Sequence, residues 1–420
     1  MAKIGLINPT SKRRNYQGLA KLSATMPPHW MAVRAAHLRN QGHTVTVCDC
    51  EVQCAFPENY TDMDRVEIMP SGVHPHAFIH EQAGIDAIED KLLTLEDNGR
   101  IVSTVLQLDF DPGPVSPDWD GFDLTNYDCH NWHGWGVPKR YPYGTLASSV
   151  SCPYNCDFCN IKNYYNTKFG FRDLALVKAE LTTLYNQGVR NIKMMDELFV
   201  VNGERLLEFC GMLQDTGYDD LNIWGYARLD CLMKMDWQES WSIPKHYGIN
   251  WLCLGIESGN RTIRAANGKG DYSNDKVITL VKTLHDHGIA VLGNFMFGFP
   301  DDTASTMQET LDLATTLNCE YSNFYCVVPY PGTETELYAK RQGWEFPPNP
   351  SAYSQYAYDF QPLPTHTLTA GEVLTFRDNA WQQYHTSATY LSMMKEKFGG
   401  GVEADITAMT KIPLERELLK

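Results

Sequence analysis

The sequence predicts an α/β protein with three parts: a small doubly wound unit, a partial barrel of six β/α units, and a helical C-terminal extension. Short β-type runs alternate with helical patterns along most of the chain, and polar residues stand where those runs end. The composition, with 43% apolar and 20% charged residues, is ordinary for a globular protein. We expect the parts at residues 1–106, 143–343 and 344–420, with a linker at 107–142.

The N-terminal unit is predicted from a β-α-β order. The apolar run KIGLINP indicates a strand, residues 28–41 form a helical pattern that ends at Gly42, and TVTVCDCE alternates like a second strand. RVEIMPSG indicates a third strand, and residues 83–96 a second helix. Residues 107–140 are rich in Pro, Gly, Asp and aromatic residues, and we interpret them as a linker that packs across a domain boundary.

The barrel is predicted from six β-type runs separated by helical patterns. The runs end at Cys152, Asp196, Arg228, Ser258, Gly298 and Val328. The helical patterns lie at residues 173–187, 203–215, 232–245, 274–287 and 303–317. This alternation predicts a parallel sheet with right-handed crossovers, whose functional residues collect at the carboxyl ends of the strands. In the last part of the chain, residues 370–394 form one further helical pattern.

Charge and composition exclude several classes of function. The 51 acidic residues outnumber the 35 basic ones, and the resulting charge of -16 argues against nonspecific binding to nucleic acid or to an anionic membrane. No run of about 18 apolar residues occurs, so we expect no membrane span. The start, MAKIGLINPTSKRRN, lacks the order of a signal peptide, and 12 cysteines are too sparse for a disulfide scaffold. We therefore expect a cytoplasmic protein.

Three clustered cysteines are the strongest chemical signal. Cys152, Cys156 and Cys159 are spaced C-x3-C-x2-C in SCPYNCDFCN, directly after a predicted strand. Three thiolates on one loop can hold three corners of a [4Fe–4S] cube and leave one iron open for a further ligand. The alternatives are a structural zinc site or three incidental buried thiols. Zinc would need a fourth Cys or His on a second knuckle, and none stands at regular spacing.

The cysteine loop and the strand ends together resemble a known family. CPYNCDFC resembles the signature of the radical S-adenosylmethionine (radical SAM) enzymes. The runs NIKMMDELFVVNGERLLEFC, IWGYARLD, LCLGIESGN, LGNFMFGFPDDTASTMQETL and YPGTETELY follow in the order and spacing of its cobalamin-linked branch, which includes the anaerobic magnesium-protoporphyrin monomethyl ester cyclases. The resemblance covers about residues 143–343 and implies a TIM-type radical SAM barrel, a [4Fe–4S] cluster on the three cysteines, and SAM at the open iron.

The resemblance also implies a set of SAM contacts at the strand ends. Asp196 and Glu197 are suited to the SAM ammonium, although DELF departs from the family's glycine/glutamate motif and an acid pair at a helix N-terminus is the alternative. Arg228 is suited to the SAM carboxylate, with a structural ion pair as the alternative. Glu257 and Ser258 are expected to bind the ribose hydroxyls or the methionyl group.

The adenine is expected near the fifth strand end. Gly298, Phe299 and Pro300 follow that strand, and glycine there lets the backbone approach a flat base closely. Phe158, between two of the cysteines, is expected to add backbone contacts to adenine, with a plain core phenylalanine as the alternative.

The function implied is reductive cleavage of SAM to a 5′-deoxyadenosyl radical that abstracts hydrogen from an unknown small molecule, with an electron donor of the flavodoxin or ferredoxin type. One version adds cobalamin and transfers a methyl group. The alternatives are a cobalamin-independent oxidation, cyclisation or rearrangement, and a non-catalytic iron–sulfur protein. The sequence assigns no catalytic residue beyond the cofactor contacts.

The N-terminal unit leaves cobalamin binding open. Its start resembles a cobalamin domain, but it lacks a D-x-H-x-x-G run and is short by about a strand and a helix. Its strand tips are expected at Asn8–Pro9, Asp49–Cys50 and Pro70–His76. If cobalamin binds, these tips should face the barrel mouth. If it does not, they should pack against the linker around Trp132 and Trp135.

Overall fold

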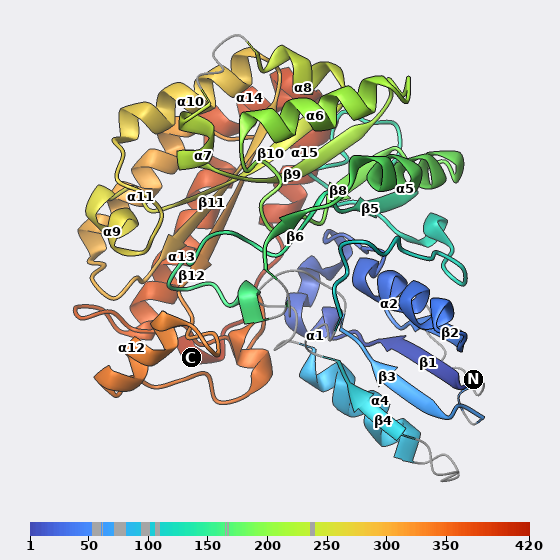
Figure 1. Ribbon diagram of the computed structural model, residues 1–420. Helices are drawn as coiled ribbons and strands as arrows, with labels where there is room; N and C mark the ends of the chain where they lie inside the picture. The colour runs from blue at the N-terminus through green and yellow to red at the C-terminus, as the bar shows by residue number, and fades with distance from the viewer. Residues whose placement is uncertain are drawn as a thin grey trace.

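The computed structural model describes most of the chain, in two sheets with the helices that flank them (Figure 1). The residues described are 1–52, 60, 62–70, 81–93, 101–105, 110–163, 165, 168–235 and 240–420. His74 and His76, and with them most of the tip expected at Pro70–His76, lie outside the described residues.

The smaller sheet is built from the N-terminal residues and is parallel throughout, in the order β2-β1-β3-β4. Its strands are β1 (Lys3–Asn8), β2 (Thr44–Asp49), β3 (Arg65–Ile68) and β4 (Ile101–Thr104). Its helices are α2 (His29–Asn40) and α4 (Gln82–Leu93), and the short α1 (Lys12–Tyr16) and the 3-10 helix η1 (Gln17–Lys21) follow β1. The strand order reverses between β1 and β3, which is the position where doubly wound sheets bind ligands. The doubly wound prediction is confirmed, and β4 is a strand that sequence reasoning missed.

The larger sheet is also parallel, and its strands follow the sequence in the order β12-β11-β10-β9-β8-β5. They are β5 (Tyr143–Leu146), β8 (Asn191–Met194), β9 (Asn222–Arg228), β10 (Ile249–Glu257), β11 (Ala290–Phe297) and β12 (Tyr321–Cys326). A two-stranded antiparallel ribbon, β6 (Ser149–Val150) with β7 (Gly170–Phe171), stands beside the end of β5. The predicted series of six β/α units with parallel strands is confirmed.

The connecting helices match the sequence patterns with two exceptions, the unexpected helix over Arg261–Ala266 and the region 232–245. They are α5 (Leu174–Asn186), α6 (Gly203–Gln214), α7 (Leu229–Met233), α8 (Ser242–His246), α9 (Arg261–Ala266), α10 (Asn274–Asp286) and α11 (Ala304–Leu317). The single helix expected over 232–245 is wrong, because that region holds the separate short helices α7 and α8. In the described part of the chain, none of the helices is long and apolar enough to span a bilayer.

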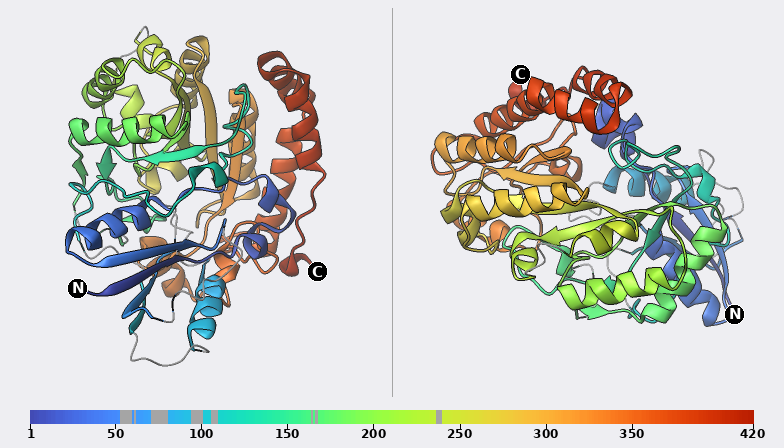
Figure 2. Two further views of the ribbon diagram at one scale, coloured as in Figure 1. Left: turned by 90° about the vertical axis from the view of Figure 1, so that its right-hand side faces the viewer. Right: turned by 90° about the horizontal axis from the view of Figure 1, so that it is seen from above.

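The C-terminal extension packs along the larger sheet, with α13 against β12 (Figure 2). The barrel part ends with α12 (Glu334–Gln342), and the extension contains α13 (Ala370–Thr386), α14 (Ala388–Phe398) and α15 (Gly400–Thr410), with 3-10 turns η5 (Pro350–Tyr353) and η6 (Glu417–Leu419). The single helix expected over 370–394 is wrong. Ser387 has extended backbone angles between α13 and α14, and its hydroxyl accepts a hydrogen bond from the Tyr390 amide as the cap of α14. The capping interaction therefore starts a second helix within one helical pattern.

Aromatic residues of the linker close the amino end of the larger sheet. The Trp132 ring lies 5.1 Å from the ring of Trp224 and 5.1 Å from that of Trp251, which belong to β9 and β10. The His133 Nε2–H donates to the Asn222 carbonyl at 3.0 Å. The Asn222 side-chain amide donates in return to the His133 carbonyl at 3.0 Å, and the side chains of Trp132, His133, Trp224 and Trp251 are all buried. This end of the sheet is therefore a packed apolar core.

A buried ion pair fixes the linker against the larger sheet. The Arg172 guanidinium donates to Glu180 on α5 at 2.6 and 2.8 Å, and both side chains are almost fully buried. The same guanidinium donates to the carbonyls of Gly113, Val115 and Ala147 at 2.7–3.0 Å. One side chain thus joins the linker, the end of β5 and α5.

Three buried histidines make the fold sensitive to acid. Burial lowers the pKa of His29 and His133 to about 3 and that of His385 to about 4. These rings stay neutral in the folded state but take up protons in the unfolded chain below about pH 6.5. We expect each to remove about 1 kcal/mol of stability between about pH 7 and about pH 5.5. Chemical denaturation at the two pH values measures the loss.

The matched variants for this test are His133→Gln, which keeps an N–H donor, and His246→Gln on the exposed side of α8. The first should reduce the pH-dependent loss by about 1 kcal/mol and the second should leave it unchanged. Equal pH dependence in the wild type and both variants would contradict the assignment.

Candidate active site at the carboxyl ends of the strands

The three clustered cysteines lie on one loop that leaves the carboxyl end of β5. All three are partly exposed, and the loop turns through a hydrogen bond from the Cys159 amide to the Cys156 carbonyl at 3.1 Å. Burial raises the pKa of the Cys152 thiol and raises that of Cys159 to about 12, and the neighbouring cysteines add to both shifts. Cys152 and Cys159 therefore lie close enough to the neighbouring thiols for these to affect their ionisation.

The donor set fits a cube better than a single ion. Among the described residues, no group of three His, Cys, Asp or Glu side chains could hold one metal ion. The thiolates of a [4Fe–4S] cube each bind a different iron, so their sulfurs lie further apart than ligands around one ion. Three thiols on one loop, without a fourth ligand in the described part, match that pattern and not a four-ligand zinc site.

Two other elements hold the cysteine loop in place. The amide and hydroxyl of Thr335, on α12, donate to the Asp157 carbonyl at 3.0 and 3.1 Å. The Tyr154 hydroxyl hydrogen-bonds with the Cys231 thiol, on α7, at 3.0 Å. Cys231 thus contacts the loop through the Tyr154 hydroxyl and is not a fourth cysteine of the loop.

Asp196, which follows β8, binds the start of the same loop. Its side chain is 2% exposed, and its two oxygens accept hydrogen bonds from the Ser148 amide at 2.9 Å, the Ser148 hydroxyl at 2.7 Å and the Ser149 hydroxyl at 2.7 Å. Burial raises the pKa of this carboxyl and these hydrogen bonds oppose the rise. Both oxygens are occupied by the protein, so Asp196 ties the end of β8 to the end of β5.

Glu197 lies between the cysteines and the interior of the sheet. It accepts a hydrogen bond from the Tyr165 hydroxyl at 3.0 Å, and burial raises its pKa well above the usual range. Its charge raises the pKa of Cys152 and Cys159, while Lys193 of β8 lowers the pKa of Glu197 itself. Of the two acids after β8, Glu197 is the one directed toward the cysteine loop.

Arg228, the last residue of β9, contacts the middle cysteine. Its Nη1 donates to the Cys156 sulfur at 3.1 Å, and its guanidinium lies 4.0 Å from the Tyr154 ring. The other donors bind Asp230 at 2.9 and 3.2 Å and the Gly268 carbonyl at 3.0 Å. Arg228 thus makes the structural ion pair named as the alternative and also places its positive charge on the cysteine loop.

Glu257 ends β10 in a strained conformation. Its φ is 64°, in the left-handed region that non-glycine residues seldom adopt, and the pairing with β11 shifts between Gly255 and Glu257. Its carboxylate forms an ion pair with Lys269 at 2.7 Å, with side chains 8% and 10% exposed. A Cβ at Gly255 would lie 2.6 Å from both charged groups, so glycine is required for the ion pair to occupy this place.

The remaining expected residues follow β11, and one of them, Phe299, contacts the cysteine loop. The amides of Gly298 and Phe299 both donate to Asp302, at 3.0 and 2.9 Å, and Gly298 has a φ of 85°. The Phe299 ring meets the Phe158 ring edge-on at 5.8 Å. The Pro300 carbonyl accepts a hydrogen bond from the His366 amide at 3.1 Å.

Ser258 is turned into the protein. It is 1% exposed, and its hydroxyl lies 3.3 Å from the Thr310 hydroxyl on α11 and accepts from the Asn260 amide at 3.1 Å. The structure therefore brings Glu197, Arg228 and Glu257 toward the cysteine loop, which contains Phe158, while Ser258 and Asp196 bind protein groups.

Sequence reasoning missed two lysines at this site. Lys269 stands in a loop without a recognisable motif, and its charge lies near both Glu257 and Cys156. Lys193 occupies an inward position of β8, and a lysine inside the run NIKMMD was the available signal.

A cavity of about 250 Å³ lies between the larger sheet and the N-terminal unit. Its wall includes Lys193 and side chains of β9 to β12 on one side, and Pro9, Thr10 and Glu51 of the N-terminal unit on the other. Asp49 instead accepts a hydrogen bond from the Tyr127 hydroxyl of the linker at 2.9 Å. Of the described strand tips, the one at Pro9 lines the cavity and the one at Asp49 contacts the linker. Trp132 of the linker also lines the cavity.

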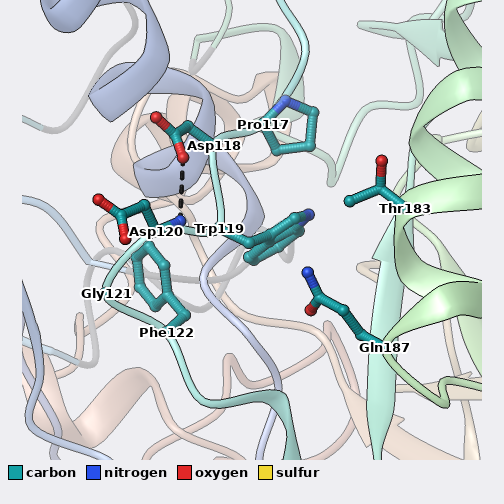
Figure 3. Close-up of a pocket in the computed structure, with 8 residues that line it drawn as sticks. All are labelled: Pro117, Asp118, Trp119, Asp120, Gly121, Phe122, Thr183 and Gln187. Atoms are coloured by element: carbon teal, nitrogen blue, oxygen red, sulfur yellow. Dashed lines mark hydrogen bonds between the residues drawn. The ribbon is translucent and has the colours of Figure 1, made fainter.

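A second pocket lies outside the site. It is a surface depression between the linker and α5, and Figure 3 shows Trp119, Thr183 and Gln187 along it, with the Asp120 amide donating to Asp118 at 2.9 Å. It shares no residue with the cysteine loop or with the strand ends.

Comparison with protein families identifies a domain in the middle of the chain. Residues 146–314 match the model of the radical SAM superfamily. An uncharacterised methyltransferase of Pyrococcus horikoshii is 27% identical over 251 residues, which are 59% of this chain and 51% of the relative. The anaerobic magnesium-protoporphyrin IX monomethyl ester cyclase of Cereibacter sphaeroides is 25% identical over 302 residues, 70% of this chain and 46% of the relative. The chain spans about half the length of these curated relatives.

Solved structures share the fold. The radical SAM methyltransferase TsrM of Kitasatospora setae, solved with cobalamin and a [4Fe–4S] cluster, has a TM-score of 0.58 at 16% identity, over 81% of this chain and 75% of that one. The cobalamin-dependent radical SAM enzyme OxsB, solved with aqua-cobalamin, has a TM-score of 0.59 at 13% identity, over 98% of this chain and 72% of that one. At these identities the likeness concerns the fold.

The Glu257–Lys269 ion pair offers a test of the site's architecture. Lys269→Met should leave the Glu257 carboxylate buried without its partner, and we expect a loss of about 3 kcal/mol or more in the free energy of unfolding. Urea denaturation measures the loss.

The matched control is Lys282→Met, which removes a lysine from an ion pair with Asp286 whose side chains are 70% and 56% exposed. That change should cost less than about 1 kcal/mol. Equal losses in the two variants would show that the pair at Glu257 is not buried as described.

Proposed function

We propose that this chain, which carries a radical SAM domain over residues 146–314, is an enzyme that cleaves SAM reductively and abstracts hydrogen from a small molecule. The observation that carries the proposal is the loop of three partly exposed thiols at the carboxyl ends of a parallel sheet, in contact with the guanidinium of Arg228. When bound, the cluster and SAM supply a 5′-deoxyadenosyl radical. The protein's task is to hold these groups and to place the substrate beside them.

The chain's cations support a cluster bound through thiolates. Burial opposes ionisation of Cys152 and Cys159, and the charge of Arg228 works against that effect at Cys152. Lys269 adds a second positive charge near Cys156. We propose that these two residues keep the thiols in the ionised form that binds iron.

The SAM contacts are proposed from the residues that face the loop. Glu257 and Glu197 supply carboxylates for an ammonium or for ribose hydroxyls, and the backbone after β11, at Gly298 to Pro300, lies beside Phe158 through the Phe299 ring. Arg228 remains a candidate for the SAM carboxylate through its contact with Cys156, although Asp230 already binds it. For Asp196 and Ser258 we propose a supporting role, because their oxygens bind neighbouring protein groups.

The electron donor is proposed by chemical class. The cysteine loop is partly exposed, so a one-electron donor of the flavodoxin or ferredoxin type in the cytoplasm can approach it. The substrate is proposed to be a small molecule, because the cavity between the larger sheet and the N-terminal unit measures about 250 Å³.

Two versions of the reaction differ in cobalamin. Methyl transfer with cobalamin is supported by the doubly wound N-terminal sheet and by relatives named as methyltransferases. A cobalamin-independent reaction is supported by the size of the cavity, because pockets for drug-sized ligands already measure about 300–1,000 Å³ and a corrinoid is larger. Tyr16, in the segment after β1, and Tyr356 both lie in the wall of this cavity, and their rings stack with centres 5.5 Å apart. The described residues, as arranged, do not fit a corrinoid, and we derive no step through it.

The cysteine loop provides the main test of the proposed function. Anaerobically reconstituted protein should carry about four irons per chain and form 5′-deoxyadenosine from SAM and a reductant. Changing Cys152, Cys156 or Cys159 to Ala should abolish both the iron content and the product.

The control is Cys210→Ala, a buried thiol of α6 away from the loop, which should keep both. Full SAM cleavage by Cys156→Ala would refute the proposal.

Cobalamin is tested by retention. We expect protein titrated anaerobically with hydroxocobalamin and then desalted to show no corrinoid absorbance, because the cavity is too small to enclose the ligand. A retained corrinoid at one per chain, with the cluster intact, would contradict this expectation and establish the methyl-transfer version as the one to pursue.

A further inference from the structure

Lys193 is a buried cation in the wall of the cavity between the larger sheet and the N-terminal unit. Its side chain belongs to β8 and is 1% exposed. Its ammonium lies 5.2 Å from the ring centre of Trp224 and 6.0 Å from that of Tyr226. Within the described residues, its Nζ has no hydrogen-bond partner. The cavity wall therefore contains a positive charge whose donors are not used by the protein.

A buried ammonium without a partner is costly. Burial lowers the pKa of Lys193 to about 8, and the charges of Glu197 and Cys253 oppose the decrease. The amine is thus still largely protonated near neutral pH. The aromatic rings offset only part of the lost hydration, since a cation over a ring uses none of its N–H donors. Two other buried cations, Lys269 and Arg172, are each bonded to a carboxylate.

The surroundings of Lys193 define the shape of a ligand. Trp132, Trp224 and Tyr321 contribute aromatic surface to the same cavity, and Asn294 and Asn323 contribute polar groups. A cavity of about 250 Å³ with aromatic walls suits one small planar molecule.

The charges of the cavity favour a single negative charge on that molecule. Besides Lys193, the wall contains Lys12, which forms an ion pair with Glu51 at 2.8 Å, and the acid Glu81. A dianion such as a phosphate monoester would meet one available cation, Lys193, beside the acid Glu81 and the Lys12–Glu51 ion pair. A carboxylate requires only the one cation.

We propose that the cavity binds a small planar carboxylic acid, with its carboxylate on the Lys193 ammonium. Such an acid is the substrate class for the radical reaction, and in this respect the inference rests on the proposed function. The position is suitable, because Lys193 lies on β8 and Glu197 follows the carboxyl end of that strand, the end at which the cysteine loop stands. A molecule bound at Lys193 therefore lies beside β8, whose carboxyl end is at the cysteine loop.

SAM also carries a carboxylate, so the experiment must separate the two sources. The probes are pairs of an acid and its neutral amide with the same shape: benzoate and benzamide, 2-naphthoate and 2-naphthamide, and indole-3-carboxylate and indole-3-carboxamide. Isothermal titration calorimetry of the cluster-reconstituted chain gives Kd for each probe and, separately, for SAM.

In the wild type, we expect at least one acid to bind about tenfold or more tightly than its amide, as a charge-assisted hydrogen bond in a dry site provides. Lys193→Met and Lys193→Gln should reduce that ratio to below about twofold and leave the Kd of SAM within about twofold. Two neutral variants are used so that a folding defect in one does not decide the result. Lys282→Met, on the exposed face of α10, should keep the wild-type ratio.

Three results would overturn the inference: no acid preference for any pair in the wild type, a preference that survives in both Lys193 variants, or a loss of SAM binding in both variants without a change in the acid preference. The last would assign Lys193 to SAM. Formation of 5′-deoxyadenosine by the wild type tests the proposed function separately. Cleavage of SAM without an acid preference refutes only the inference, and an acid preference without SAM cleavage refutes only the proposed function.

Discussion

The hydrogen bonds around the Asp196 carboxylate set the position of everything else at the site. Asp196 follows β8, and its carboxylate accepts hydrogen bonds from Ser148 and Ser149 just beyond β5. These bonds join the two strand ends and the loop that follows them. The cysteine loop begins only a few residues later, and its direction depends on that anchor. A buried carboxylate with three donors is stable only if all three stay in place, and this requirement makes the loop's origin rigid.

The repeated strands and helices could be predicted from the sequence because their patterns are local. Alternating runs such as NWLCLGIES and AVLGNFMFG become β10 and β11, and their polar ends meet at one edge because parallel strands share a direction. Helix breaks were harder to predict, since the break at Ser387 comes from a cap hydrogen bond inside an otherwise helical pattern. The strand β4 was missed because a four-residue edge strand carries little periodicity.

The site's long-range partners could not be predicted in the same way. Asp196 and Arg228 were expected beside a cofactor, but Ser148 and Asp230 are the groups that bind them in the structure. Lys269 comes to Glu257 from a loop after α9, and no spacing in the sequence indicates that meeting. Such contacts depend on how the loops fold over the strand ends, and this is determined by packing of the whole sheet rather than by any short motif.

The linker residues at the amino end of the sheet bear on how this chain can be divided. The family match ends at residue 314, before β12, and it begins after Trp132. Trp132, the strands and the C-terminal helices nevertheless belong to one continuous apolar core. A fragment cut at the borders of the match would lose its last strand and would expose Trp224 and Trp251 to water. The matched segment is therefore not a unit that can be separated from its flanks and still keep its core out of water.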